Sequence, residues 1–158
     1  MQEELRRFVE ENEDCFERSH RTGHITGSAW IVDLRREKVL LTHHHRLDKW
    51  MQLGGHADGD ADVLRVALRE AREESGLADI RSLSESIYDV DVHEIPARGI
   101  EPAHLHYDVR FLFEADANLA LGITPESKAL AWVKLGDVAG LTNERSVLRM
   151  VEKTPGLR

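Results

Sequence analysis

The chain has a single cysteine, no long apolar run and no excess of positive charge, and each absence excludes a class of protein. Cys15 has no partner for an intramolecular disulfide, which favours a reducing compartment. No stretch approaches the roughly 20 apolar residues that span a bilayer. The first residues also lack the basic and apolar segments of a signal peptide. We therefore expect a cytoplasmic protein that does not enter a membrane.

The charge balance is acidic, with a formal net charge of −8 at pH 7. Nucleic-acid backbones are bound mainly through clustered Lys and Arg, so this balance argues against nucleic acid as a partner. It does not exclude a small phosphorylated ligand, because a bound cation reverses the local field. The 158 residues contain no repeat or linker and suit a single domain, 1–158, with a helical extension at 1–20. We expect a monomer or a homodimer.

The most informative segment runs from Gly54 to Leu77 and reads GGHADGDADVLRVALREAREESGL. Its second half has an apolar stripe at helical spacing, formed by Leu64, Ala67, Leu68 and Ala71. Beside that stripe, Glu70, Glu73 and Glu74 stand at i, i+3 and i+4, a spacing at which like charges repel by about 0.2–0.5 kcal/mol per pair. A solvated acidic face is one interpretation. A hard divalent cation such as Mg²⁺, which would offset the repulsion, is the other.

The ends of this helix are also marked in the sequence. Asp60 or Asp62 is placed to cap its first turn. Gly76 is placed to end it as a C-cap. Gly54 and Gly55 open a flexible loop that can bring backbone carbonyls close to the carboxylates.

The whole segment resembles a Nudix box: Gly, five residues, Glu, seven residues, then Arg-Glu-apolar-any-Glu-Glu-any-Gly-apolar. The positions in register are Gly55, Arg69, Glu70, Ala71, Glu73, Glu74, Gly76 and Leu77. One position departs, since Ala61 stands where the pattern has its first Glu, with Asp60 and Asp62 on either side. In the family that Glu supports the helix and its Arg, so the departure bears on metal affinity more than on the fold.

The resemblance implies an α+β fold, namely an α/β/α sandwich with a mixed sheet. It also implies a hydrolase that cleaves the pyrophosphate bond of a nucleoside diphosphate linked to another group, with Mg²⁺ or Mn²⁺ as cofactor. The implied metal ligands are the Gly54 carbonyl, Glu70, Glu73 and Glu74. A carboxylate must accept the proton of the attacking water, and Glu70 or Glu126 is the candidate. Glu126 precedes a predicted strand, and an ordinary loop acid is the alternative.

Further candidates for substrate contact lie on a strand and in the glycine loop. Residues 104–113 alternate between an apolar face and a polar one, and His104, His106 and Arg110 share the polar face. They are predicted to contact substrate, with a solvent-facing strand surface as the alternative. His56 and Arg69 are also candidates. His56 would equally suit stabilisation of the loop, and Arg69 holding the helix through a carboxylate.

Two other functions are compatible with these residues. The first is a catalytically silent nucleotide-binding module on the same fold, which the Ala61 departure would allow. The second is a zinc hydrolase that uses His104, His106 and a third histidine such as His93.

The remaining pattern predicts helices and strands around the central helix. The expected helices are 2–17 and 144–153, and the expected strands are 23–32, 38–42, 49–53, one or two within 80–95, 103–114 and 130–135.

Overall fold

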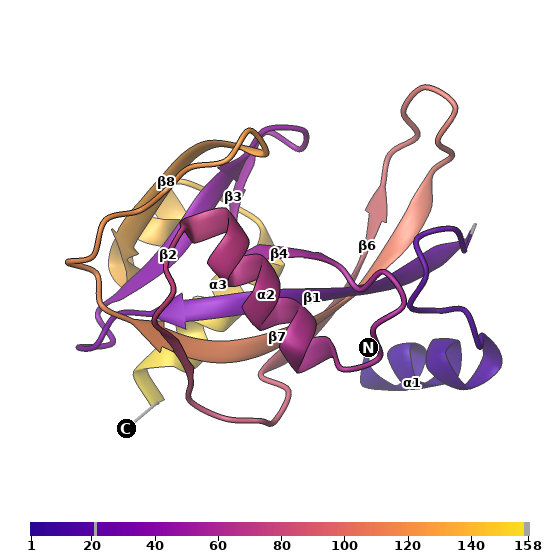
Figure 1. The fold of residues 1–158 in the computed structure, drawn as a ribbon, viewed down its shortest axis with the longest axis horizontal. Coiled ribbons are helices and arrows are strands. Elements are labelled where there is room, and N and C mark those ends of the chain that lie inside the picture. The colour runs from indigo at the N-terminus through magenta and orange to yellow at the C-terminus, as the bar shows by residue number, and fades with distance from the viewer. Residues whose placement is uncertain (21, 157–158) are drawn as a thin grey trace.

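A mixed sheet of eight strands lies between helices in the computed structural model, which describes residues 1–20 and 22–156 (Figure 1). The helices are α1 (Gln2–Glu11), α2 (Val63–Ser75) and α3 (Arg145–Lys153), with short 3-10 turns η1 (Leu135–Gly140) and η2 (Thr154–Gly156). The strands are β1 (Gly23–Val32), β2 (Lys38–His44), β3 (Lys49–Met51), β4 (Leu53–His56), β5 (Ile80–Ser82), β6 (Asp89–Ile95), β7 (His104–Ala115) and β8 (Ser127–Lys134).

The main path of the sheet is β3-β2-β1-β7-β5, and three more strands pair beside it, β4 with β1, β6 with β7 and β8 with β2. β1 and β7 run parallel along their full contact, whereas the other pairs are antiparallel. The expected α+β sandwich with a mixed sheet is therefore confirmed. The division into one domain with an extension at 1–20 stays a prediction.

Central strand β1 shows how the two layers form. Its odd-numbered residues face α2, where Gly27 lies against Val63 and Val66. On the other face, Trp30 and Val32 pack in a second apolar cluster that includes residues of α3. The first residues of that same face, His24, Thr26 and Ser28, are polar yet buried. This polar half of the sheet face becomes the floor of the site.

Helix α2 begins and ends where its sequence indicates. The Asp62 side chain accepts a hydrogen bond from the Arg65 amide at 3.2 Å, and Gly76 ends the helix in the left-handed conformation at φ 73°. Asp60 instead binds the Arg65 guanidinium, with N···O distances of 2.8 and 2.7 Å. A Cβ at Gly55 would lie 2.6 Å from the Glu70 carboxyl carbon, so any side chain there would displace the Glu70 carboxylate.

The largest differences from the expected boundaries concern three elements. Helix α1 stops at Glu11, since the backbone of Asn12 is extended and its side-chain amide binds the Phe8 carbonyl at 2.8 Å. The expected strand 49–53 divides into β3 and β4, because the chain changes its pairing partner from β2 to β1. Strand β8 starts at Ser127 instead of 130. None of the helices in the described part of the chain is long and apolar enough to cross a membrane.

Candidate active site

A cavity of about 430 Å³ opens over the polar half of the sheet face. Residues of β1, β2, β4, β6 and β7 line it, together with α2 and the loop before β8. Its volume is within the range of roughly 300–1,000 Å³ that is usual for small-ligand sites. The cavity therefore has room for a nucleotide-sized molecule.

The floor of the cavity is organised by Asp108. Its Oδ1 accepts hydrogen bonds from the hydroxyls of Thr26 and Ser28, at 2.8 and 2.7 Å. Its Oδ2 accepts from Gln52 Nε2 at 3.2 Å and from Arg110 Nε at 2.9 Å. With four protein donors, this carboxylate is held rigidly and has little capacity left to bind a cation.

One wall of the cavity is acidic. Glu70 and Glu74 reach it from α2, and Glu126 comes from the loop before β8. Burial raises the pKa of Glu74 to about 8, and repulsion from Glu70 and Glu126 adds to that rise. Burial, followed by repulsion from Glu73, also raises the pKa of Glu70. Neighbouring carboxylates do not readily ionise at the same time, and a divalent cation bound between them stabilises their ionised forms.

Basic and imidazole side chains line other parts of the cavity. Arg18 comes from the loop before β1 and is held by Asp58, with N···O distances of 2.8 and 2.7 Å. Arg46 follows β2, and its Nη2 lies 3.3 Å from the Glu101 carboxylate. Opposite charges thus face one enclosed space, an arrangement suited to a ligand that carries phosphate beside a cation. Sequence reasoning missed both arginines, since nothing local to them signals a site.

A family model for the NUDIX domain matches residues 24–151, most of the chain. The chain belongs to the Nudix hydrolase family. Its expected class, a Nudix pyrophosphohydrolase, is thereby confirmed at the level of the family. A search of curated proteins finds no match.

Solved Nudix structures share the fold at low identity. An E. coli dihydroneopterin triphosphate pyrophosphohydrolase has 17% identity and a TM-score of 0.66, with 82% of this chain and 92% of that one covered. A C. elegans Ap4A hydrolase in a binary complex has 16% identity and a TM-score of 0.64, with 84% and 95% covered. The NUDIX domain of Shewanella oneidensis NrtR, solved with ADP ribose, has 16% identity and a TM-score of 0.56, with 96% of each covered.

The cavity brings together several residues that the Nudix box and the strand pattern predicted, and leaves others outside. The predicted residues on its wall are Gly54, His56, Glu70, Glu74, His106 and Glu126. Glu73 is an exposed neighbour on the same helix. Arg69 donates to the His56 carbonyl at 3.3 Å and lies 3.5 Å from a Glu70 carboxylate oxygen. Its contacts match the alternative role, in which it joins the helix to the glycine loop.

Arg110 was predicted to contact substrate, but it does not lie on the cavity wall. Its side chain is 2% exposed and lies 3.2 Å from Asp89 and 2.9 Å from Asp108. Its Nη1 also donates to the Ser146 carbonyl of α3 at 3.1 Å. Alternation placed Arg110 on the correct sheet face, but that part of the face is covered by α3. These contacts join α3 to the sheet, and we no longer assign Arg110 a contact with substrate.

The histidines of the site also differ from the predicted set. His104 is not among the residues that line the cavity, and its Nδ1 lies 3.0 Å from the Pro102 carbonyl oxygen. His93 Nδ1 lies 3.2 Å from Asp91. Among the described residues, the trio whose ring nitrogens converge is His24, His56 and His106, and not His93 with His104 and His106. Sequence reasoning missed His24, although its alternation with Thr26 and Ser28 marks a polar face.

The raised pKa of Glu74 predicts how the stability of metal-free protein depends on pH. The folded pKa of about 8 exceeds the ordinary value of 4.5, so between these values the folded state alone keeps this proton. The unfolding free energy therefore falls as pH rises across that window, at most by about 1 kcal/mol per pH unit, and levels off above pH 8. Urea unfolding with a chelator, from pH 7 to 8.5, avoids the titration of unfolded imidazoles near pH 6.5.

The control for this measurement is Glu74→Gln, which removes the titrating group and should flatten the profile between pH 7 and 8. Mg²⁺ should raise the unfolding free energy of the parent protein, because a cation that binds only the folded state stabilises it by mass action. A parent profile that is flat, or that rises with pH, would contradict the burial of an uncompensated carboxyl group at Glu74.

Proposed function

We propose that this Nudix protein hydrolyses the pyrophosphate bond of a nucleoside diphosphate linked to another group, using Mg²⁺ or Mn²⁺. The observation that carries the proposal is the convergence of Glu70, Glu74 and Glu126 on one cavity that Arg18 and Arg46 also line. Carboxylates to hold a cation and guanidinium groups to hold phosphate oxygens are the two requirements for binding a pyrophosphate.

The donor set fits the proposed cofactor. Glu70, Glu73, Glu74 and the Gly54 carbonyl would supply oxygen ligands only, which hard cations such as Mg²⁺ and Mn²⁺ prefer. Burial, and then repulsion from neighbouring carboxylates, raises the pKa values of Glu70 and Glu74, and a cation beside them would offset both effects. When bound, such an ion neutralises phosphate charge and lowers the pKa of a coordinated water.

The remaining roles belong to the protein's own side chains. Glu126 or Glu70 takes the proton of the water that attacks phosphorus, since both carboxylates line the cavity. The backbone of Glu126 is fixed, because its carbonyl accepts from the His45 amide at 2.9 Å. Arg18 and Arg46 bind and orient the phosphate oxygens. Arg69 keeps the helix in place against the glycine loop through its bond to the His56 carbonyl.

The substrate class rests on cavity size and on the family. About 430 Å³ suits a small soluble nucleotide derivative better than a polymer. The structural relatives named above include proteins described with Ap4A, with dihydroneopterin triphosphate and with ADP ribose. These names guide the choice of compounds for a test and do not select one. The partner of this chain is then a small phosphorylated nucleotide, bound by a monomer or a homodimer.

The decisive experiment measures product formation from a panel of nucleoside triphosphates, nucleotide sugars, ADP-ribose and dinucleoside polyphosphates. Each compound is incubated with Mg²⁺, with Mn²⁺ or with a chelator, and the products are identified by mass. We expect turnover that needs the metal and yields a nucleoside monophosphate. Binding without turnover across the panel would contradict the proposal and favour the silent nucleotide-binding module.

A further inference from the structure

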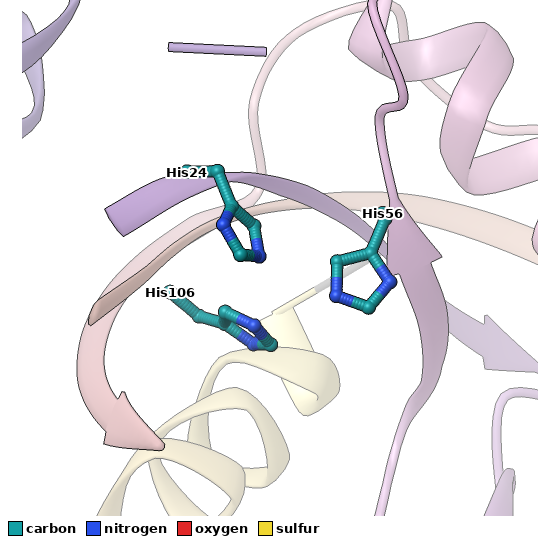
Figure 2. Close-up of side chains that lie close together, drawn as sticks. All are labelled: His24, His56 and His106. Atoms are coloured by element: carbon teal, nitrogen blue, oxygen red, sulfur yellow. The ribbon is translucent and has the colours of Figure 1, made fainter. Parts of the chain in front are cut away.

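Three imidazoles from three different strands point toward one another (Figure 2). The strand register explains why they meet. His24 of β1 and His106 of β7 are direct partners in the parallel pair. His56 of β4 is the partner of Thr26, which lies two residues from His24 and so on the same face. The convergence is thus fixed by backbone pairing and does not depend on flexible loops.

The three rings are close enough for one ion. Their centroids are 5.0 Å apart for His24 and His56, 4.7 Å for His24 and His106, and 5.3 Å for His56 and His106. One nitrogen from each ring lies within 4.8 Å of the other two. In a tetrahedral zinc site with bonds of about 2.0–2.1 Å, ligand nitrogens are about 3.4 Å apart. Side-chain rotations that close each gap by roughly 1 Å would complete the site.

His24 gives a second, independent reason to look for a ligand. It is 3% exposed, and neither of its ring nitrogens has a hydrogen-bond partner among the residues that the structure describes. An unpaired buried polar group is costly, so such groups are rarely left without a partner. A metal ion bound to one nitrogen would remove part of that cost.

The protonation state of the rings favours a cation over an anion. Burial, with the neighbouring imidazoles, lowers the pKa of His24 to about 4 and that of His106 to about 2. Neutral imidazole has a free lone pair and is the form that binds metal. A phosphate would instead be held more strongly by protonated rings, in which both nitrogens donate.

We propose that His24, His56 and His106 form a binding site for a transition-metal ion of the Zn²⁺ type, separate from the carboxylate site. Nitrogen ligands suit Zn²⁺, whereas the oxygen ligands of the neighbouring wall suit Mg²⁺. His56 and His106 line the cavity, so an ion held by these residues would border the space where substrate would bind. His104 Nε2 lies 3.3 Å from His106 Nε2 and adds a fourth imidazole at the edge of the group.

The test is Zn²⁺ binding by the full chain in excess Mg²⁺, measured by competition with a chromophoric chelator. Co²⁺ absorption in the visible range then reports the coordination geometry. We expect one equivalent to bind the parent protein with tetrahedral bands. His24→Gln and His106→Gln should each weaken binding by more than about 100-fold, since even the loss of a group that only supports a ligand costs 10–100-fold.

Two matched variants locate the ion. His43→Gln changes a partly exposed histidine that pairs with Asp48 outside the cavity, and it should bind Zn²⁺ like the parent. Glu74→Gln changes the carboxylate wall and leaves the three imidazoles in place, so it should weaken Zn²⁺ binding far less than His24→Gln or His106→Gln does. Loss of Zn²⁺ binding in Glu74→Gln, with binding intact in His24→Gln and His106→Gln, would overturn the proposal.

A measurement on the unaltered protein keeps the test valid if a histidine variant fails to fold. X-ray absorption at the zinc edge distinguishes imidazole ligands from carboxylates by the scattering of the ring atoms. We expect at least three imidazoles in the zinc-loaded parent protein. A shell of oxygen ligands alone, or no zinc retained at one equivalent, would refute the site. Neither result depends on turnover, so the outcome is independent of the proposed hydrolase activity.

Discussion

Glu73→Gln is expected to lower metal-dependent turnover by at least about 100-fold while leaving the fold intact. The substitution removes a negative charge from the proposed cation site, and a catalytic metal contributes several kcal/mol to transition-state stabilisation, each 1.36 kcal/mol being about tenfold in rate. The Glu73 side chain is exposed and packs no core, so the loss should be confined to catalysis.

The stability of this variant should move in the opposite direction from its activity. Glu73 is one of the charges that raise the pKa of Glu70, which shows that the two carboxylates repel each other. Removing it relieves repulsion worth about 0.2–0.5 kcal/mol per pair. In metal-free buffer, the midpoint of urea unfolding should therefore be unchanged or slightly higher than that of the parent.

The measurement combines initial rates over a range of Mg²⁺ concentrations with urea unfolding of the same samples. Glu85→Gln is the matched control, because Glu85 is an exposed glutamate between β5 and β6, away from the cavity. It should keep the parent's rate. If Glu73→Gln also turned over within about threefold of the parent, the acidic strip would be structural and the mechanism wrong.

Arg110→Met should destabilise the protein by about 3–5 kcal/mol, the usual cost of removing one partner from a buried ion pair. The guanidinium group is held by Asp89, Asp108 and the Ser146 carbonyl, and its side chain is 2% exposed. Methionine has a similar length but leaves these oxygens without their donor. The change can be measured by urea unfolding monitored by circular dichroism.

Arg145→Met is the control, on helix α3, which Arg110 contacts from β7. Arg145 pairs with Glu152 at 2.7 Å, but both side chains are largely exposed, so the loss of stability should be much smaller than that of Arg110→Met. If the two substitutions lowered the free energy of unfolding equally, Arg110 would not be the residue that joins α3 to the sheet. KM at a temperature where both variants are folded adds a second criterion. A rise of more than about tenfold in Arg110→Met alone would restore Arg110 as a substrate contact.

The sequence by itself predicted the features that depend on neighbours along the chain. Helix α2, its Asp62 and Gly76 caps and its strip of carboxylates follow from helical spacing. The two faces of β7 follow from the two-residue period of a strand. The number of matching positions in the Nudix box indicated the family. The division of residues 49–53 into two strands was missed, because pairing partners are not encoded in local pattern.

Only the tertiary structure decided which polar residues share the cavity. His106 and Arg110 lie on one face of β7, yet His106 lines the cavity and Arg110 lies under α3. How much of the β7 face α3 covers is set by tertiary packing. The alternation of polar and apolar residues is the same in the covered and the uncovered part, so it does not show where the helix ends. His24 meets His106 because β1 and β7 pair in parallel with a particular register. Residues so far apart in the chain carry no local signal of such contact, since register is fixed by the burial of whole strands.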